Sequence, residues 1–225
     1  MNKATILANG EFPKRCESLQ AIKKSPLLIC CDGAYKKLVD SGIFDNSTLK
    51  QVPQIHVIGD GDSLPAGLKG NPPFPTLFVE GWTDQECNDL TKAVRYALTL
   101  GTTEIDILGA TGLREDHTLG NISLLGQYCQ MPAGDGKRLG VRMLTDCGVF
   151  MPVTKSCTLP TFKGQQVSIF ALTPGLLLTS EGLKYPIERR ELRWWWEATL
   201  NEALGNSFSL TIEGEGVVLV FLVNG

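Results

Sequence analysis

The segment Ile58-Gly59-Asp60-Gly61-Asp62-Ser63-Leu64 continues an apolar run and places two carboxylates one residue apart around a glycine. In an extended chain Asp60 and Asp62 project to the same side, and Gly61 lets the backbone turn sharply between them. Two such carboxylates, together with polyphosphate oxygens, suit Mg²⁺, which rarely occupies an all-protein cage. The same residues are also typical of an ordinary turn in which Asp and Ser bond their own backbone. The segment predicts a strand that ends at an acidic turn, with a metal site and a plain turn as the two alternatives.

A second acidic segment, Thr83-Asp84-Gln85-Glu86-Cys87-Asn88-Asp89, precedes a run in which apolar residues recur every three or four positions. That spacing predicts a helix over 88–100. Asn88 is a good N-cap and an acid at Asp89 complements the helix dipole, so Asp89 has a capping alternative to a catalytic role. Asp84 lies too far upstream to cap the helix.

A third segment, Leu108-Gly109-Ala110-Thr111-Gly112-Leu113-Arg114-Glu115-Asp116-His117, leaves another apolar run and enters a Gly/Thr-rich turn before a predicted helix. Phosphates bind at such strand-to-helix turns because free N–H groups converge there and glycine lets the backbone approach. For Arg114 the alternative to a phosphate contact is an ion pair with Glu115 or Asp116. For Asp116 the stronger interpretation is capping of the following helix. His117 is expected in the first turn, with contact to a nucleotide as a secondary role.

Apolar runs alternate with helical patterns as far as about residue 130, which predicts a parallel sheet covered by helices. The expected strands are 4–8, 27–31, 56–58, 76–79 and 104–108, and the expected helices are 18–24, 34–41, 88–100 and 118–129. Ligands bind beyond the carboxyl ends of the strands in such a sheet, and each acidic segment follows a predicted strand. One crevice is therefore expected to collect Asp32, Asp60, Asp62, Asp84 and Arg114.

Beyond a Gly/Pro-containing break at 131–137 the pattern changes to short strands between turns, which is typical of a small antiparallel sandwich or barrel. These strands are expected at 141–144, 149–153, 166–172, 175–178, 207–212 and 217–222, while 188–199 fits helix, strand or loop. The expected fold class is α/β: an N-terminal Rossmann-like parallel-sheet domain with helices over residues 1–135, followed by a small C-terminal antiparallel β-sandwich or barrel-like domain over residues 136–225.

Composition excludes several classes of function. The chain has 225 residues and a formal net charge of −3, with Lys and Arg scattered, so nucleic-acid binding is not expected. No apolar stretch has the length of a secretory signal or a membrane span, so no membrane association is expected. Seven cysteines, an odd number without a Cys-x-x-Cys pair, indicate reduced thiols and predict a cytoplasmic location. His56 and His117 have no cysteine or histidine at ligand spacing, so zinc is not expected, and His56 is interpreted as a core residue.

Five motifs, in order along the chain, resemble those of the thiamine pyrophosphokinase family. They are similar to its Asp-Gly-Gly turn, its Gly-Asp-Phe-Asp-Ser box, its Asp-x-Asp-x-Thr-Asp-x-x-Lys stretch, its Gly-Ala-Thr-Gly-Gly-Arg-x-Asp-His box and a motif in the second half. The matching segments are Cys31-Asp32-Gly33-Ala34, Gly59-Asp60-Gly61-Asp62-Ser63, Asp84 to Lys92, Gly109 to His117, and Gly182-Leu183-Lys184-Tyr185-Pro186.

Some residues depart from the family pattern. Ala34, Gly61 and Leu113 replace a glycine, an aromatic residue and a glycine, respectively. The chain reads Thr199-Leu200-Asn201-Glu202 where the family usually has a Ser-Asn pair, and a Trp194-Trp195-Trp196 run precedes it. These changes leave the phosphate and metal motifs intact and bear on the vitamin pocket.

The resemblance implies transfer of the diphosphate of ATP to the hydroxyl of thiamine, giving thiamine diphosphate and AMP, with Mg²⁺ as cofactor. The first domain would bind ATP and Mg²⁺, and the second would bind thiamine and form a homodimer whose active site is shared between subunits. The catalytic candidates are Asp60, Asp62, Asp84, Asp89, Lys92 and Arg114, with Asp60, Asp62 and Asp84 as metal ligands. The ATP-binding candidates are Asp32, Gly33, Asp60, Thr111, Gly112, Arg114, Asp116 and His117. Any of the carboxylates could orient or deprotonate the attacking hydroxyl.

Thiamine carries a permanent positive charge, so its pocket should offer aromatic faces rather than bases. The thiamine-binding candidates are Trp194, Trp195, Trp196 and Asn201. A subunit contact or a core position is the alternative for the tryptophans, and adjacent residues cannot all face one ligand.

Two other functions remain open at the level of sequence. A pyrophosphokinase acting on a pterin alcohol, 6-hydroxymethyl-dihydropterin, would share the metal and ATP motifs. A non-catalytic nucleotide sensor would keep the Gly-rich turns without needing the three metal-binding acids. A Rossmann dehydrogenase is disfavoured because Gly109-Ala110-Thr111-Gly112 is not G-x-G-x-x-G and lies in the wrong βα unit.

Overall fold

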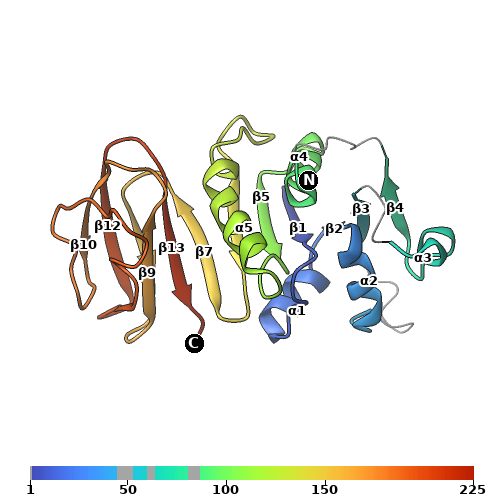
Figure 1. The fold of residues 1–225 in the computed structure, drawn as a ribbon, viewed down its shortest axis with the longest axis horizontal. Helices are drawn as coiled ribbons and strands as arrows, with labels where there is room; N and C mark the ends of the chain where they lie inside the picture. Colours follow the sequence, from blue (N-terminus) through green and yellow to red (C-terminus); the bar gives the residue numbers. More distant parts are fainter. Residues whose placement is uncertain (1, 45–52, 60–63, 81–86) are drawn as a thin grey trace. The chain divides into compact units, whose positions relative to one another are not determined.

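The computed structural model describes residues 2–44, 53–59, 64–80 and 87–225 (Figure 1). The chain divides into two compact units, Met1–Asp146 and Cys147–Gly225. Among the described residues, no helix is long and apolar enough to cross a membrane.

The first unit is a parallel sheet with the strand order β6-β5-β1-β2-β3-β4. Its strands are β1 Lys3–Leu7, β2 Leu27–Cys31, β3 Gln54–Ile58, β4 Thr76–Val79, β5 Glu104–Leu108 and β6 Gly140–Leu144. Its helices are α1 Cys16–Lys23, α2 Asp32–Asp40, α3 Ala66–Gly70, α4 Asp89–Thr99 and α5 Glu115–Tyr128. The predicted parallel sheet with helices is confirmed; the short helix α3 was not expected.

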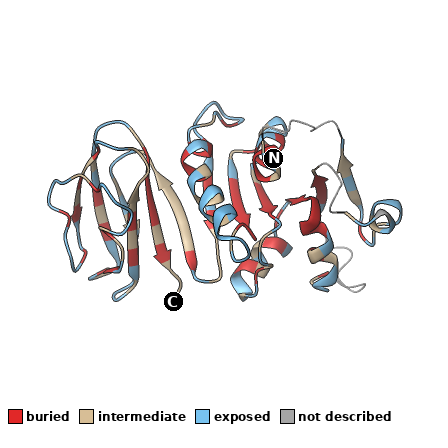
Figure 2. Ribbon diagram, in the orientation of Figure 1, coloured by how far each residue is buried: buried red, intermediate tan, exposed pale blue. Residues whose placement is uncertain are grey.

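The strands of this unit are apolar along most of their length because helices cover both faces of the sheet. Figure 2 shows the central strands as buried. Alternate residues separate the two faces: Ile55 and Val57 pack in a cluster with residues of α1 and α2, whereas His56 between them contacts Tyr96 of α4. Helix α5 is joined to α4 by a hydrogen bond between the hydroxyls of Tyr128 and Thr91, at 2.7 Å.

Strand β6 differs from the expectation for residues 141–144. It pairs in parallel with β5, and Arg142 on β6 forms a two-pronged ion pair with the buried Asp106 on β5, with N–O distances of 2.9 Å. The first unit therefore extends to Asp146 rather than ending at 135. A short apolar strand carries no mark of its partner; here β6 pairs with β5, and the ion pair between Arg142 and Asp106 accompanies that pairing.

The second unit contains two antiparallel sheets, with orders β11-β9-β13-β7 and β10-β12-β8. The strands are β7 Gly148–Val153, β8 Cys157–Pro160, β9 Gln166–Ala171, β10 Leu177–Glu181, β11 Asn201–Glu202, β12 Ser207–Glu213 and β13 Val218–Val223. The predicted antiparallel domain is confirmed, although β8 and β11 were not expected. Its core lies between the sheets, where Ile169 and Val220 of one meet Leu178 and Phe208 of the other. Residues 188–199 form neither helix nor strand, apart from a bridge at Arg190.

Candidate active site

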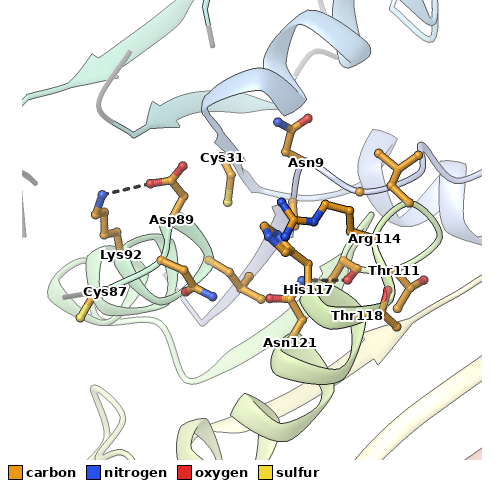
Figure 3. Close-up of a pocket in the computed structure, with 16 residues that line it drawn as sticks. Asn9, Cys31, Cys87, Asp89, Lys92, Thr111, Arg114, His117, Thr118 and Asn121 are labelled. Atoms are coloured by element: carbon orange, nitrogen blue, oxygen red, sulfur yellow. Dashed lines mark hydrogen bonds and ion pairs between the residues drawn. The ribbon is translucent and has the colours of Figure 1, made fainter. Parts of the chain in front are cut away.

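A cavity of about 570 Å³ opens where strands β1, β2 and β5 end (Figure 3). The loop after β1, the end of β2, the start of α4 and the β5–α5 turn form its wall. Its polar side chains include Asn9, Asp89, Lys92, Thr111, Arg114 and His117. This is the position at which an open parallel sheet binds ligands.

The Gly/Thr-rich turn after β5 is tied to the loop after β1. The N–H of Gly10 donates to the carbonyl of Gly109 at 2.6 Å, and the N–H of Glu11 donates to that of Thr111 at 2.8 Å. Gly109 and Gly112 have φ of 63° and 92°, values that favour glycine. The turn thus presents Thr111 to the cavity, whereas Gly112 is not among the described residues that line it.

Arg114 lies on the cavity wall immediately before α5 and forms an ion pair with Asp116. The distances are 3.0 Å from Nε to Oδ1 and 2.5 Å from the terminal nitrogen to Oδ2. Hydrogen bonding to Arg114 lowers the pKa of Asp116 to about 2, and the same bond raises the pKa of Arg114. Both side chains are mostly exposed, so the pair is weak and can open to admit a stronger anion. The ion-pair alternative for Arg114 therefore describes this structure, with Asp116 as its partner.

Asp116 also serves the start of α5. Its Oδ1 accepts the N–H of His117 at 2.9 Å, which satisfies a donor in the first turn of the helix. This contact agrees with the capping interpretation, and Asp116 itself does not belong to the described lining. His117 lines the cavity and is exposed.

At the start of α4, one polar residue caps the helix and the next contacts a lysine. Asn88 is the N-cap, because its side-chain oxygen accepts the N–H of Thr91 at 2.8 Å. Asp89 accepts instead from Nζ of Lys92 at 3.0 Å, and both line the cavity (Figure 3). Lys92 is buried, with 6% of its surface exposed. Among the described residues, the structure thus places a buried cation and its carboxylate partner Asp89 at the cavity.

Asp32 and Gly33 form the first turn of α2 and are buried. The side chain of Asn9 covers Gly33 so closely that an added Cβ would lie 2.5 Å from its Nδ2 atom. A Cβ at Gly59 would lie 2.6 Å from that of Asp32. Of this motif, Cys31 is among the described residues that line the cavity, whereas Asp32 and Gly33 are not.

The predicted metal ligands Asp60, Asp62 and Asp84 lie outside the described residues. In the part of the chain that the structure describes, no group of three His, Cys, Asp or Glu side chains is placed to hold a metal ion. Cys87, three residues after Asp84 in the chain, lines the cavity.

The three tryptophans of the second unit have different environments. Trp195 packs edge-on against Phe170 of β9, with ring centroids 5.9 Å apart. Trp194 and Trp196 are 67% and 73% exposed. Both lie in a turn held by Glu197, whose carboxylate accepts the N–H of Trp194 at 3.0 Å. Trp195 is less exposed, at 41%, so the three tryptophans differ in packing and in exposure.

Asn201 differs from its expected role. Its amide nitrogen donates to the carbonyl of Tyr185 at 2.7 Å, and its oxygen accepts the N–H groups of Tyr185 and Glu202 at 3.1 and 2.9 Å. Asn201 is also buried, with 4% of its surface exposed. In this structure its hydrogen-bonding capacity goes largely to the backbone around the Gly182 to Pro186 motif.

Sequence reasoning did not single out several lining residues. Asn9 and Gly10 follow the first apolar run, and the rule that placed ligands after strands applied to them as well. Thr118 and Asn121 lie on α5, where Asn121 donates to the carbonyl of Ala110 at 2.8 Å and fixes the turn. Their helical spacing from Arg114 was the signal available for finding them.

Comparison with known proteins identifies the family. Residues 19–133 match the profile described as thiamin pyrophosphokinase, catalytic domain, and residues 148–221 match thiamin pyrophosphokinase, substrate-binding domain. The first profile alone spans more than half of the chain. The chain belongs to the thiamin pyrophosphokinase family. The resemblance seen in the sequence motifs is confirmed. Search of curated protein sequences gave no match.

Solved structures share the fold. Thiamine pyrophosphokinase from Bacillus subtilis is 21% identical, with a TM-score of 0.74 and 99% of each chain covered. The enzyme from Candida albicans is 17% identical with a TM-score of 0.78, covering 99% of this chain and 90% of that one. The yeast enzyme is 16% identical with a TM-score of 0.80, covering 99% and 86%. The protein therefore carries the catalytic domain of an enzyme family, and the family match favours a thiamine acceptor over the pterin and nucleotide-sensor alternatives.

Proposed function

We propose that the protein transfers the diphosphate group of ATP to the hydroxyl of thiamine. The hydroxyl oxygen attacks the β-phosphorus, the bond from that phosphorus to the bridging oxygen of the α-phosphate breaks, and AMP leaves with the electron pair. The hydroxyl proton passes to a base. Such a reaction needs positioning and charge neutralisation more than covalent chemistry from the protein.

The observation that carries this proposal is the cavity in which a Gly/Thr-rich turn, Arg114 and Lys92 meet. Arg114 presents a planar fork of donors that suits phosphate oxygens, and its weak pair with Asp116 leaves it exchangeable. Lys92 adds a compact charge whose position is fixed by Asp89. Thr111 and the amides of its turn complete the phosphate side.

Mg²⁺ is the proposed cofactor. The described lining holds one carboxylate, Asp89, and that group is already paired with Lys92, so the described residues alone do not make a magnesium site. Asp60, Asp62 and Asp84 remain the proposed ligands on the strength of their sequence motifs. When bound, the ion would neutralise charge on the polyphosphate.

The second unit supplies the proposed thiamine contacts. A cationic thiazolium ring favours an aromatic face, and Trp194 and Trp196 are the most exposed of the three tryptophans. We propose that they lie at a homodimer contact in which each second unit completes a site of the partner chain. Leu200, which is exposed and has a left-handed φ of 59°, follows the same segment in the chain. We propose a cytoplasmic location for the enzyme, because an odd set of cysteines suits a reducing compartment.

Incubation with ATP, Mg²⁺ and thiamine tests the function directly. Both products are quantified by chromatography, and AMP and thiamine diphosphate are expected in equal amounts. ADP as the main nucleotide product would instead indicate an ordinary kinase. A parallel incubation with 6-hydroxymethyl-dihydropterin is expected to give no diphosphate ester.

A further inference from the structure

Lys37 on helix α2 binds the loop that follows strand β1. Its Nζ donates to the backbone carbonyls of Asn9 at 2.8 Å and Gly10 at 2.7 Å. Among the described residues, no carboxylate lies within ion-pair distance of this ammonium group. Carbonyl dipoles orient a cation without cancelling its charge, so Lys37 leaves net positive charge beside the loop.

The loop that Lys37 holds is a wall of the cavity. Asn9 and Gly10 line it, and the N–H groups of Gly10 and Glu11 bond the turn after β5. The two loops are in close contact at Gly10, where an added Cβ would lie 2.4 Å from the carbonyl oxygen of Gly109. Lys37 thus binds the carbonyls of a segment whose N–H groups position the phosphate-binding turn.

A second contact joins the same helix to the same loop. The amide of Asn9 covers Gly33 in the first turn of α2, one helical turn before Lys37. The side chains of Lys37 and Asn9 therefore join helix α2 to the loop after β1, and backbone hydrogen bonds join that loop to the turn after β5. Lys37 itself does not belong to the described lining, so its effect on a ligand passes through the loop.

We propose that Lys37 is a positioning residue for the nucleotide: by holding the carbonyls of Asn9 and Gly10, it keeps the β1 loop and the Thr111 turn in the arrangement that binds the phosphates of ATP. This inference rests on the proposed function for the identity of the nucleotide. It assigns to Lys37 a role that the acidic and Gly-rich motifs do not include.

Replacement of Lys37 by methionine tests the proposal, because methionine keeps an unbranched apolar side chain and removes the donor and the charge. Lys37→Met is expected to raise the KM for ATP by about tenfold, as the loss of charge-assisted hydrogen bonds implies. The KM for thiamine should stay within about twofold, because the altered loop faces the phosphates. Lys37→Arg, which keeps charge and donors, should recover most of the ATP affinity.

The neighbouring lysine gives a matched control. Lys36 is exposed on the same helix and pairs with Asp40, so Lys36→Met should leave both KM values unchanged. Gly10→Ala provides a second route to the same defect, because the added methyl group forces the β1 loop away from the carbonyl oxygens of Gly109 and Thr111. It should raise the KM for ATP in the same direction.

Calorimetric titration with ATP and Mg²⁺ in the absence of thiamine separates this inference from the proposed function. If the wild type binds ATP but makes no thiamine diphosphate, the function fails while weaker ATP binding by Lys37→Met still supports the positioning role. Unchanged ATP affinity in Lys37→Met and Gly10→Ala would overturn that role. An equal loss of affinity for ATP and thiamine, together with a lowered melting temperature, would also overturn it, because a purely structural residue would have that effect. If Lys37→Met does not fold, Lys37→Gln, with a shorter donor, is judged by the same measurements.

Discussion

At the scale of single residues, two cations that line the cavity each form an ion pair with a carboxylate. Arg114 is paired with Asp116 at the surface of the cavity, and Lys92 is paired with Asp89 deeper in its wall. Exposed pairs are weak, whereas a buried cation depends on its partner. The two cations are therefore expected to differ in what their removal does.

Replacement of Arg114 by methionine should lower kcat/KM for ATP by about a hundredfold, because a preorganised cation at the phosphates is lost. Asp116→Asn is the matched variant, since it releases Arg114 from its partner without removing it. If Arg114 serves the phosphates, Asp116→Asn should keep the KM for ATP within about twofold of the wild type. Equal losses in the two variants would mean that the ion pair itself matters. Steady-state kinetics with ATP as the varied substrate decide the point.

His56 makes the stability of the first unit sensitive to acid. Its Nδ1 bonds the hydroxyl of Tyr96 at 2.9 Å, while its Nε2 is buried without a partner in the described structure. Burial lowers the pKa of His56, so the folded protein resists a proton that the unfolded chain accepts near pH 6.5. The stabilisation is therefore fully present above about pH 6.5 and is lost as the pH falls below that value.

The melting temperature of the wild type should accordingly fall between pH 8 and pH 5, and His56→Gln should reduce that fall. His117→Gln, which removes the other histidine of the chain at an exposed position, is measured alongside as the control. Identical pH dependence in the wild type and His56→Gln would refute the assignment.

At the scale of elements, the sequence predicted the strands and helix ends that depend on a local residue pattern. Apolar runs located β1, β2 and β5, and Asn88 marked the start of α4. The partner of β6 was not predictable, because β6 pairs with β5, which lies far away in the chain. The site divides in the same way. The Thr111 turn could be predicted from its glycines. The contact of Lys37 with the β1 loop joins residues far apart in the chain, and no local sequence pattern indicates it.

The Trp segment depends on a single carboxylate for its shape. Glu197 accepts the N–H groups of Arg193 at 2.5 Å and Trp194 at 3.0 Å, and these bonds contribute to the lowered pKa of its carboxyl group. Glu197→Ala should loosen the turn and raise the KM for thiamine several-fold, with the KM for ATP unchanged. Glu188→Ala, at an exposed acid of the same segment, is the control. Equal KM values for thiamine in Glu197→Ala and the wild type would show that the turn does not serve the vitamin.

At the scale of the whole molecule, each family profile falls within one structural unit: 19–133 within Met1–Asp146, and 148–221 within Cys147–Gly225. The division between a catalytic and a substrate-binding domain thus coincides with the division of the fold. The second unit carries exposed aromatic residues, and the first carries the cavity for which phosphate binding is proposed.

The tryptophans and the acidic motif test that sharing together. Trp196→Ala or Trp194→Ala should raise the KM for thiamine by the equivalent of about 0.5–2 kcal/mol of cation–π contact, whereas Trp195→Ala should lower the melting temperature by removing the packing on Phe170. Asp62→Asn should nearly abolish turnover, because an amide is a poor ligand for magnesium.

When an Asp62→Asn chain is mixed with a chain carrying the responsible tryptophan substitution, some sites in the heterodimer combine an intact acidic motif with an intact tryptophan. Activity of the purified heterodimer should then exceed that of either mutant homodimer. Absence of such recovery in a heterodimer verified by mass spectrometry would show that each chain completes its own site.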